Sequence, residues 1–391
     1  MKCDLVVVGA GPAGSMTAKV AAEAGLDVVM LEKRQEIGDP VRCAEGVSKA
    51  ALKKLVEPDP SWISADVKGA RIRAPDGTEI VISEDRAGAE VGYVLERKVF
   101  DRALAQRAAE AGAKVMVKTR ALCLLWEKGV PAGVSAAFVG ENLKIEAPLV
   151  IGADGVESKV GRWAGIDTAL KPKDIETCAQ FLVQDDGIDD DYCEFYLGNE
   201  IAPGGYVWSF PKGHSLANVG IGVLGSKADS GTPIRLLRKF MKTNFPDGKV
   251  LEMMAGGVPV SGPIEATVAD GVILVGDAAR QSDPITGGGI INGMRAGVMA
   301  GEIAADLVPK GELDRKALSV YEKRWRETIG KSITRNFGVK EFFVDLTDDD
   351  LNSLIHSLDG VNVAELDLKG LLKVLVRQNP KLLLKLRHLI V

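Results

Sequence analysis

The sequence predicts an α/β fold in which a nucleotide-binding domain is joined to a second, β-rich domain and a helical C-terminal region. Three patterns indicate this. Residues 3–8 form a short apolar run with β-branched side chains, and a glycine-rich turn, an alanine-rich helical segment over 12–24 and a second apolar run over 27–31 follow it. Between about residues 175 and 260, apolar and polar side chains alternate as they do in strands. Residues 311–391 have the pattern of helices.

The order of these elements predicts domains that are discontinuous in the sequence. Two short strands over 70–74 and 79–82 are joined by residues 75–77, Pro-Asp-Gly, which have the chemistry of a hairpin turn. An amphipathic helix over 95–111 then ends at Gly112. We therefore expect a nucleotide-binding domain in residues 1–60, 95–165 and 265–310, a substrate-binding β-sheet domain in 61–94 and 166–264, and a helical region in 311–391.

The composition is typical of a globular protein. Hydrophobic residues make up 46% of the 391 residues and charged residues 26%, and no apolar run reaches the ~18 residues of a membrane-spanning helix. The net charge of −5 argues against a nucleic-acid partner, because phosphate binding requires a basic surface. The five cysteines lack metal-ligand spacing. We therefore expect reduced thiols, no metal, and a cytoplasmic protein whose contact with the inner face of the membrane is at most peripheral.

The N-terminal segment contains a dinucleotide fingerprint. Gly9, Gly11 and Gly14 form the pattern G-x-G-x-x-G between the first strand and its helix. The first glycine makes a tight turn, the second admits the pyrophosphate, and the third lets helix and strand pack closely. Glu32 ends the second strand, where a carboxylate accepts hydrogen bonds from ribose hydroxyls. This fingerprint does not distinguish FAD from NAD.

Two later motifs resemble signatures of flavin-dependent hydroxylase-like proteins. They are residues 152–155, Gly-Ala-Asp-Gly, with Ser158 and Arg162, and Gly276-Asp277 followed by Pro284. The resemblance implies a glutathione-reductase-like FAD-binding Rossmann domain, with Asp277 on the ribityl chain and Arg97 at the FAD phosphates. The residue types suit these roles, since a carboxylate accepts from hydroxyls and a guanidinium pairs with phosphate. The alternatives are a helix N-cap for Asp277 and a surface ion pair for Arg97.

Three further motifs resemble the archaeal geranylgeranyl reductase family. They span residues 39–46, Asp-Pro-Val-Arg-Cys-Ala-Glu-Gly, 206–211, Tyr-Val-Trp-Ser-Phe-Pro, and 287–290, Gly-Gly-Gly-Ile. This family saturates isoprenoid chains of archaeal ether lipids, and the likeness covers nearly the whole chain. It implies that further residues bind FAD: Ala13 at the pyrophosphate, Ala121 at the adenine end through its backbone, Cys43, Ala44 and Gly46 against the flavin, and Gly289 and Ile290 at the start of a helix that points at it.

Four residues are candidates for substrate binding or catalysis. Tyr206, Trp208 and Phe210 alternate on an expected strand, so their rings share one face and are candidates for the wall of a lipid tunnel. The alternative is that they are ordinary core residues. Cys43 is the only thiol inside a family motif and a candidate proton donor to the alkene. The alternative is an inert buried cysteine.

The partners are less well defined by the sequence. The resemblance implies an isoprenoid ether phospholipid as substrate. A second dinucleotide fingerprint is absent, so the electron donor is a transiently bound NADPH, a reduced ferredoxin or a deazaflavin. Six basic residues interspersed with leucines predict a tail that binds anionic lipid or packs as a helix pair: Lys369, Lys373, Arg377, Lys381, Lys385 and Arg387.

Two other function classes fit the early motifs. A flavin monooxygenase or halogenase acting on a hydrophobic substrate consumes oxygen, whereas a reductase works anaerobically. A flavoprotein without catalytic activity, which carries lipid or electrons, would bind flavin and saturate no polyprenyl chain.

Overall fold

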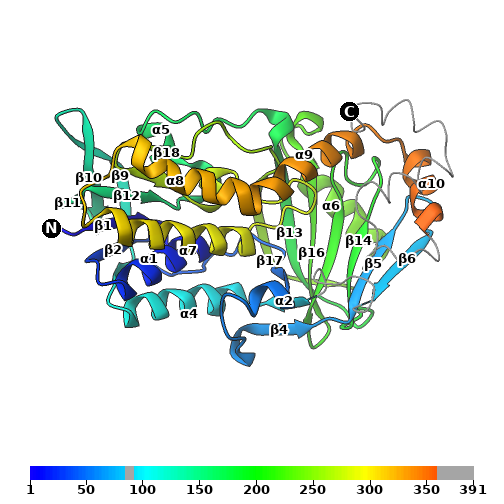
Figure 1. The fold of residues 1–391 in the computed structure, drawn as a ribbon. Coiled ribbons are helices and arrows are strands. Elements are labelled where there is room, and N and C mark those ends of the chain that lie inside the picture. The colour runs from blue at the N-terminus through cyan, green and yellow to red at the C-terminus, as the bar shows by residue number, and fades with distance from the viewer. Residues whose placement is uncertain (84–91, 359–391) are drawn as a thin grey trace. The chain divides into compact units, whose positions relative to one another are not determined.

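The structure is a computed structural model that describes residues 1–83 and 92–358 (Figure 1). The basic tail expected over 369–387 lies outside the described residues. Contacts divide the chain into two compact units, each discontinuous in sequence. Within the described ranges no helix combines the length and apolarity needed to cross a membrane. The first unit comprises residues 1–41, 97–170 and 259–336, and the second comprises 42–96, 171–258 and 337–391.

This division differs from the expected boundaries most in two places, besides smaller shifts at residues 95–96, 166–170 and 259–264. Residues 42–60, expected in the nucleotide-binding domain, belong to the second unit, because β3 (Gly46–Ser48) pairs with β7 (Gly92–Leu95) in a small sheet of that unit. The expected separate C-terminal region is split between the units at residue 336. The assignment of one domain to FAD and the other to substrate stays a prediction.

The first unit is built on a six-stranded sheet in the order β18-β19-β12-β1-β2-β8. Its central strands β1 (Leu5–Val8), β2, β12 and β19 are parallel, and β1 reads Leu-Val-Val-Val without alternation because helices cover one of its faces and mainly strands of a second sheet cover the other. A second sheet, β11-β10-β9, is antiparallel. The other strands of the unit are β2 Val28–Leu31, β8 Lys114–Met116, β9 Thr119–Glu127, β10 Val130–Phe138, β11 Glu141–Glu146, β12 Leu149–Gly152, β18 Val268–Ala269 and β19 Val272–Leu274.

Helices α1 (Pro12–Glu23) and α7 (Ile290–Leu307) pack side by side in this unit, blue and yellow in Figure 1. A Cβ at Gly297 would lie 2.3 Å from the Ala13 carbonyl oxygen, and one at Gly301 would lie 2.7 Å from the Val20 Cβ. Only glycine permits this backbone approach. The remaining helical segments are η3 Gly155–Glu157, α4 Arg97–Glu110, α5 Lys159–Trp163, η6 Gly276–Ala279, α8 Arg315–Trp325, the π-helical turn η7 Arg326–Gly330, and α9 Lys331–Phe343, which ends in the second unit.

The second unit contains a seven-stranded sheet in the order β17-β13-β16-β15-β14-β5-β6 and the small sheet β3-β7-β4. The hairpin expected over 70–82 is confirmed as the antiparallel pair β5 (Gly69–Arg73) and β6 (Glu79–Ser83). Further elements are α2 Lys49–Leu52, η1 Pro60–Trp62, β4 Ile63–Asp66, η4 Pro172–Asp174, β13 Ile175–Gln184, β14 Tyr192–Tyr196, β15 Val207–Gly213, β16 Leu216–Leu224, η5 Gly225–Lys227, α6 Thr232–Asn244, β17 Lys249–Pro259 and α10 Asp348–Leu358.

The two faces of the large sheet have different cores. Leu237, Phe240 and Met241 form the buried stripe of amphipathic α6 and pack on one face against Phe181 and Val219. The other face carries Trp208, Phe210, Cys178, Cys193 and Phe195 in a separate cluster. This alternation along β13 and β15 assigns each strand residue to a face.

Candidate active site

The glycine loop begins where β1 ends and reaches the N-terminus of α1. Gly9 has φ +111°, and a Cβ on it would lie 2.2 Å from the Ala153 carbonyl oxygen. A Cβ on Gly14 would lie 1.9 Å from the carbonyl oxygen of Gly9, whereas one on Gly11 would meet no atom within 4 Å. No side chain caps α1. Gly9 and Gly14 therefore serve packing, while Gly11 and the helix N-terminus stay open for a phosphate.

Glu32 follows β2 at the same edge of the sheet. Its Oε2 accepts from the Ala10 N–H at 3.3 Å, and its Oε1 accepts from the Arg34 N–H at 2.9 Å. The Thr119 N–H donates to the backbone oxygen of Glu32 at 2.8 Å, and Ala121 stands two residues further along β9. The fold thus brings the expected ribose and adenine contacts into one neighbourhood beside the glycine loop.

Asp277 and Gly289 meet at the start of α7. A Cβ on Gly289 would lie 2.9 Å from Asp277 Oδ1, and Cβ atoms on Gly276 and Gly293 would lie 3.0 and 3.4 Å from the Ala13 Cβ. Burial raises the pKa of Asp277, and the positive charges of Arg280 and Arg97 oppose that rise. Asp277 lies inside η6, whose N-cap is Val275, so the N-cap interpretation of Asp277 is wrong. Ile290 is the first residue of α7.

Arg97 opens α4 and pairs with a carboxylate of its own helix. Its Nε and Nη2 donate to the two oxygens of Asp101 at 2.7 and 2.8 Å. Arg97 thus forms an ion pair, but not the surface pair of the alternative, since its side chain is 16% exposed and that of Asp101 6%. Arg97 is also within electrostatic range of Asp277, 180 positions away in sequence.

Sequence reasoning did not single out Arg280, and it named Asp154 only as part of the motif over 152–155. Arg280 is buried, and its guanidinium donates to the backbone oxygens of Val156, Asp277 and Thr168. In the described residues its Nε and Asp154 Oδ1 are buried atoms without hydrogen-bond partners. In the sequence, Arg280 is a single basic residue among mostly small and apolar neighbours. This pattern could have marked it as a candidate.

Parallel strands explain why these residues meet. β1, β2, β12 and β19 end at one edge of the sheet, and their order reverses at β1 and β12, which is where open α/β sheets bind ligands. The open Gly11, the uncapped α1 and the adjacent Asp277 and Gly289 suit a dinucleotide with a ribityl chain. The residues of the first unit fit FAD.

In the second unit, the loop carrying Cys43, Ala44 and Glu45 is held by buried polar contacts. Glu45 is a non-glycine residue at φ 77° and is 3% exposed. Its N–H donates to Cys43 Sγ at 3.2 Å, and its Oε2 accepts from Lys212 Nζ and Asn218 Nδ2, both at 2.6 Å. The loop conformation is therefore fixed by side chains from β15 and β16.

The aromatic row confirms that Tyr206, Trp208 and Phe210 share a face. Tyr206 packs at 5.9 Å from Trp208 between ring centroids, and Phe195 lies 5.5 Å from Tyr206 and 5.3 Å from Phe210. Trp208 and Phe210 are 7% and 8% exposed, so both side chains also belong to the hydrophobic core of this unit. A Cβ on Gly46 would lie 2.8 Å from the Phe210 ring. The row and the loop therefore contact each other within this unit.

Gln180 links the row to the loop. The Trp208 indole N–H donates to Gln180 Oε1 at 2.9 Å, and Gln180 Nε2 donates to the Cys43 carbonyl oxygen at 3.1 Å. A Cβ on Gly220 would lie 2.3 Å from the indole, so glycine there makes room for it. Sequence reasoning missed Gln180, although an amide between the apolar residues Ala179 and Phe181 was a usable signal.

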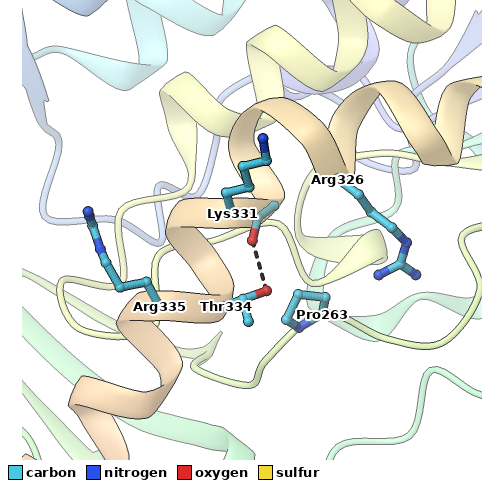
Figure 2. Close-up of a pocket in the computed structure, with 6 residues that line it drawn as sticks. Pro263, Arg326, Lys331, Thr334 and Arg335 are labelled. Atoms are coloured by element: carbon cyan, nitrogen blue, oxygen red, sulfur yellow. Dashed lines mark hydrogen bonds between the residues drawn. The ribbon is translucent and has the colours of Figure 1, made fainter. Parts of the chain in front are cut away.

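A surface hollow of about 420 Å³ in the first unit is lined by cationic side chains. Figure 2 shows that Arg326, Lys331 and Arg335 point away from one another, so they do not converge on a single anion. The dashed line marks the Thr334 hydroxyl donating to the Gly330 carbonyl oxygen at 2.9 Å. None of the expected site residues lines this hollow.

The chain is similar to several known proteins. The family model described as the geranylgeranyl reductase catalytic domain matches residues 174–258, and the lycopene cyclase protein model matches residues 4–180. A digeranylgeranylglycerophospholipid reductase of Methanothrix thermoacetophila is 66% identical over 390 residues, which is 100% of both chains. The chain belongs to the digeranylgeranylglycerophospholipid reductase family. The recognition made from the motifs is confirmed.

Solved structures extend the family relationship to the fold. A geranylgeranyl bacteriochlorophyll reductase-like protein from Thermoplasma acidophilum superposes with a TM-score of 0.93 at 39% identity and covers 99% of both chains. A flavin-dependent brominase superposes with a TM-score of 0.70 at 18% identity, covering 99% of this chain and 100% of its own, which shows a shared fold alone. The glutathione-reductase-like fold prediction is confirmed. The halogenase alternative has only this distant likeness.

Proposed function

We propose that this protein is an FAD-dependent reductase that saturates the isoprenoid double bonds of the geranylgeranyl chains of digeranylgeranylglycerophospholipids. The observation that carries the proposal is the 66% identity, over the full length of both chains, with a relative of that name. FAD supplies the hydride that an unactivated alkene cannot otherwise obtain. The chain itself must bind the cofactor, hold the alkene in a dry site and deliver a proton.

The first unit supplies the proposed FAD contacts. The open backbone at Gly11 and the N-terminus of α1 support a pyrophosphate site, and the buried Asp277 beside Gly289 supports a site for ribityl hydroxyls. The full proposed set in this unit is Gly9, Gly11, Ala13, Gly14, Glu32, Arg97, Ala121, Asp277, Gly289 and Ile290. In the second unit, Cys43, Ala44 and Gly46 are proposed to lie against the flavin.

The second unit supplies the proposed alkene site. Tyr206, Trp208 and Phe210 offer an apolar, aromatic wall, and the hydrogen bonds through Gln180 hold Cys43 beside it. Packed aromatic side chains exclude water, which a hydride transfer to an unactivated alkene requires. Cys43 is a candidate catalytic residue, either as a proton donor or by shaping the site.

The electron donor and the membrane contact belong to the same proposal. NADPH, a reduced ferredoxin and a deazaflavin are the donors to compare, because the chain shows one dinucleotide fingerprint. Since the proposed substrate is a membrane lipid, we also propose a cytoplasmic protein with peripheral contact at the inner face of the membrane.

An anaerobic single-turnover experiment tests the function. The purified protein is reduced with dithionite, mixed with digeranylgeranylglyceryl phospholipid, and followed by flavin absorbance and product mass. We expect flavin reoxidation with a gain of two hydrogens per turnover. Flavin that stays reduced until air enters, with oxygen then found in the product, would replace the reductase by a monooxygenase.

A further inference from the structure

A further buried acid lies on the face of the large sheet that carries Trp208 and Phe210. Glu176, near the start of β13, is 9% exposed. Within the described part of the chain no hydrogen bond or ion pair reaches its carboxyl group. Buried carboxyl groups nearly always have hydrogen-bond partners, because desolvation without one is costly. The lack of a partner therefore favours the neutral, protonated form of this carboxyl group.

Two glycines leave the space that this carboxyl group occupies. A Cβ on Gly222 would lie 2.3 Å from Glu176 Oε2, and a Cβ on Gly205 would lie 3.2 Å from Oε1. Gly222 stands on β16 opposite Cys178, and Gly205 immediately precedes Tyr206. Any larger residue at Gly222 would displace the carboxyl group.

Glu176 belongs to the same face as the proposed alkene site. Glu176, Cys178 and Gln180 alternate along β13, so their side chains point to one side of the sheet. Gln180 accepts from the Trp208 indole on that side. Burial raises the pKa of the Cys178 thiol between them, and the charges of Glu176 and Cys43 raise it further. The acid therefore lies on the same face as Gln180, which contacts the loop that carries Cys43.

The electrostatic surroundings suit a group that gives up a proton. Burial raises the pKa of Glu176 to about 7, and the positive charge of Lys340 opposes the rise. Lys340, on α9, is 6% exposed and is held by the Lys173 carbonyl oxygen and by Glu341 Oε1, both at 2.8 Å. Among the described residues the Cys178 thiol also faces the acid, and β16 and the turn before β15 present glycines to it.

We propose that Glu176 supplies the proton that completes reduction of the isoprenoid double bond. The inference rests on the proposed reductase function. Hydride from reduced FAD forms a C–H bond at one alkene carbon, and FAD is oxidised. The π-electron pair forms the second C–H bond with the proton of Glu176, whose O–H bond breaks. Lys340 stabilises the resulting carboxylate, and solvent returns the proton before the next turnover.

The test uses the FAD-loaded protein, reduced anaerobically and mixed with digeranylgeranylglyceryl phospholipid between pH 5.5 and 9. We expect the wild-type rate of flavin reoxidation to fall above about pH 7, since the acid must be protonated. Glu176→Gln should slow reoxidation at least ~100-fold, in the range typical of general acids. Its rate should no longer fall at alkaline pH. Glu176→Asp, which keeps a carboxyl group, should recover part of the rate and its fall at alkaline pH.

Glu194→Gln is the matched control. Glu194 is a half-buried acid of the same sheet that accepts from Tyr196 and Arg73 on the α6 face, and its substitution should leave the pH profile unchanged. A Glu176→Gln protein with a rate within threefold of wild type and the same fall at alkaline pH would overturn the proposal. A wild-type rate that does not fall at alkaline pH would also overturn it. That rate can be measured even if the Glu176→Gln protein loses FAD. A wild-type protein that never reoxidises on the alkene instead refutes the reductase function.

Discussion

Lys212 donates a 2.6 Å hydrogen bond from its ammonium group to the carboxylate of Glu45, and both side chains are nearly excluded from solvent, at 7% and 4% exposure. The same ammonium reaches the Leu95 carbonyl oxygen at 2.6 Å. Breaking a buried ion pair leaves the remaining charge uncompensated, which typically costs ~3–5 kcal/mol. The pair therefore holds the loop that carries Cys43 in place. Substitution of either partner should destabilise the folded protein.

We expect Lys212→Met to lower the free energy of unfolding by about 3 kcal/mol, because the buried Glu45 carboxylate loses the ammonium group that balances its charge. Urea titration measures it. Lys19→Met is the control, since Lys19 pairs with Glu23 on the surface of α1 and such pairs are worth at most ~1 kcal/mol. Equal losses in the two variants would show that the Glu45 pair is not a fixing contact.

Two alanine substitutions separate packing from cofactor binding in the glycine loop. Gly14→Ala drives a methyl group against the Gly9 carbonyl oxygen and should destabilise the FAD-free protein by about 3 kcal/mol. Gly11→Ala meets no atom within 4 Å, so the FAD-free protein should keep its stability within ~0.5 kcal/mol while FAD affinity falls at least tenfold. Thermal unfolding and equilibrium FAD titration give the two values. Unchanged FAD affinity in Gly11→Ala would move the pyrophosphate away from this loop.

Asp277→Ala should weaken FAD binding, because the proposed acceptor for ribityl hydroxyls is removed. We expect a loss of ~10–100-fold, equivalent to one or two charge-assisted hydrogen bonds. Asp283, whose Oδ1 accepts from the backbone N–H groups of Ile285 and Thr286, provides the control Asp283→Ala. Similar FAD affinities for the two variants would contradict the role of Asp277.

Gln180→Leu should free the loop that carries Cys43. It leaves the Trp208 indole N–H without its acceptor and the Cys43 carbonyl oxygen without that donor, at a cost of ~1–3 kcal/mol for each buried group. We expect Cys43 to react faster with a maleimide, measured by mass spectrometry in a Cys123→Ser background because Cys123 is exposed. Unaltered Cys43 labelling would mean that Gln180 does not restrain the loop.

The pH dependence of stability gives an independent measure of Glu176. Its pKa is raised from 4.5 to about 7 in the folded protein, so between these values the folded state holds a proton that the unfolded state has lost. Stability should therefore fall as the pH rises from 4.5 to 7. At about 1.4 kcal/mol per pKa unit, this amounts to about 3 kcal/mol, and Glu176→Gln should abolish that part of the slope. Identical slopes for both proteins would exclude the raised pKa.

Local patterns predicted the regular elements well. The helix expected over 95–111 is α4, Arg97–Glu110, and the strand expected over residues 3–8 contains β1, Leu5–Val8. Boundaries of this kind depend on periodicity and on glycine stops, which are properties of neighbouring residues. The domain boundary near residue 42 was missed, because β3 finds its partner β7 more than forty positions later.

The sequence by itself determined the fingerprint of Gly9, Gly11 and Gly14 and the motifs that identify the family, since each is a local spacing with a local geometric purpose. Only the tertiary structure decided which side chains meet: Glu45 with Lys212, Trp208 with Gln180, and Glu176 with the space left by Gly222. These contacts join strands distant in sequence, and their energies depend on burial, which composition and spacing do not specify. The physical reason is that hydrogen bonds and charges become decisive only after folding removes water from them.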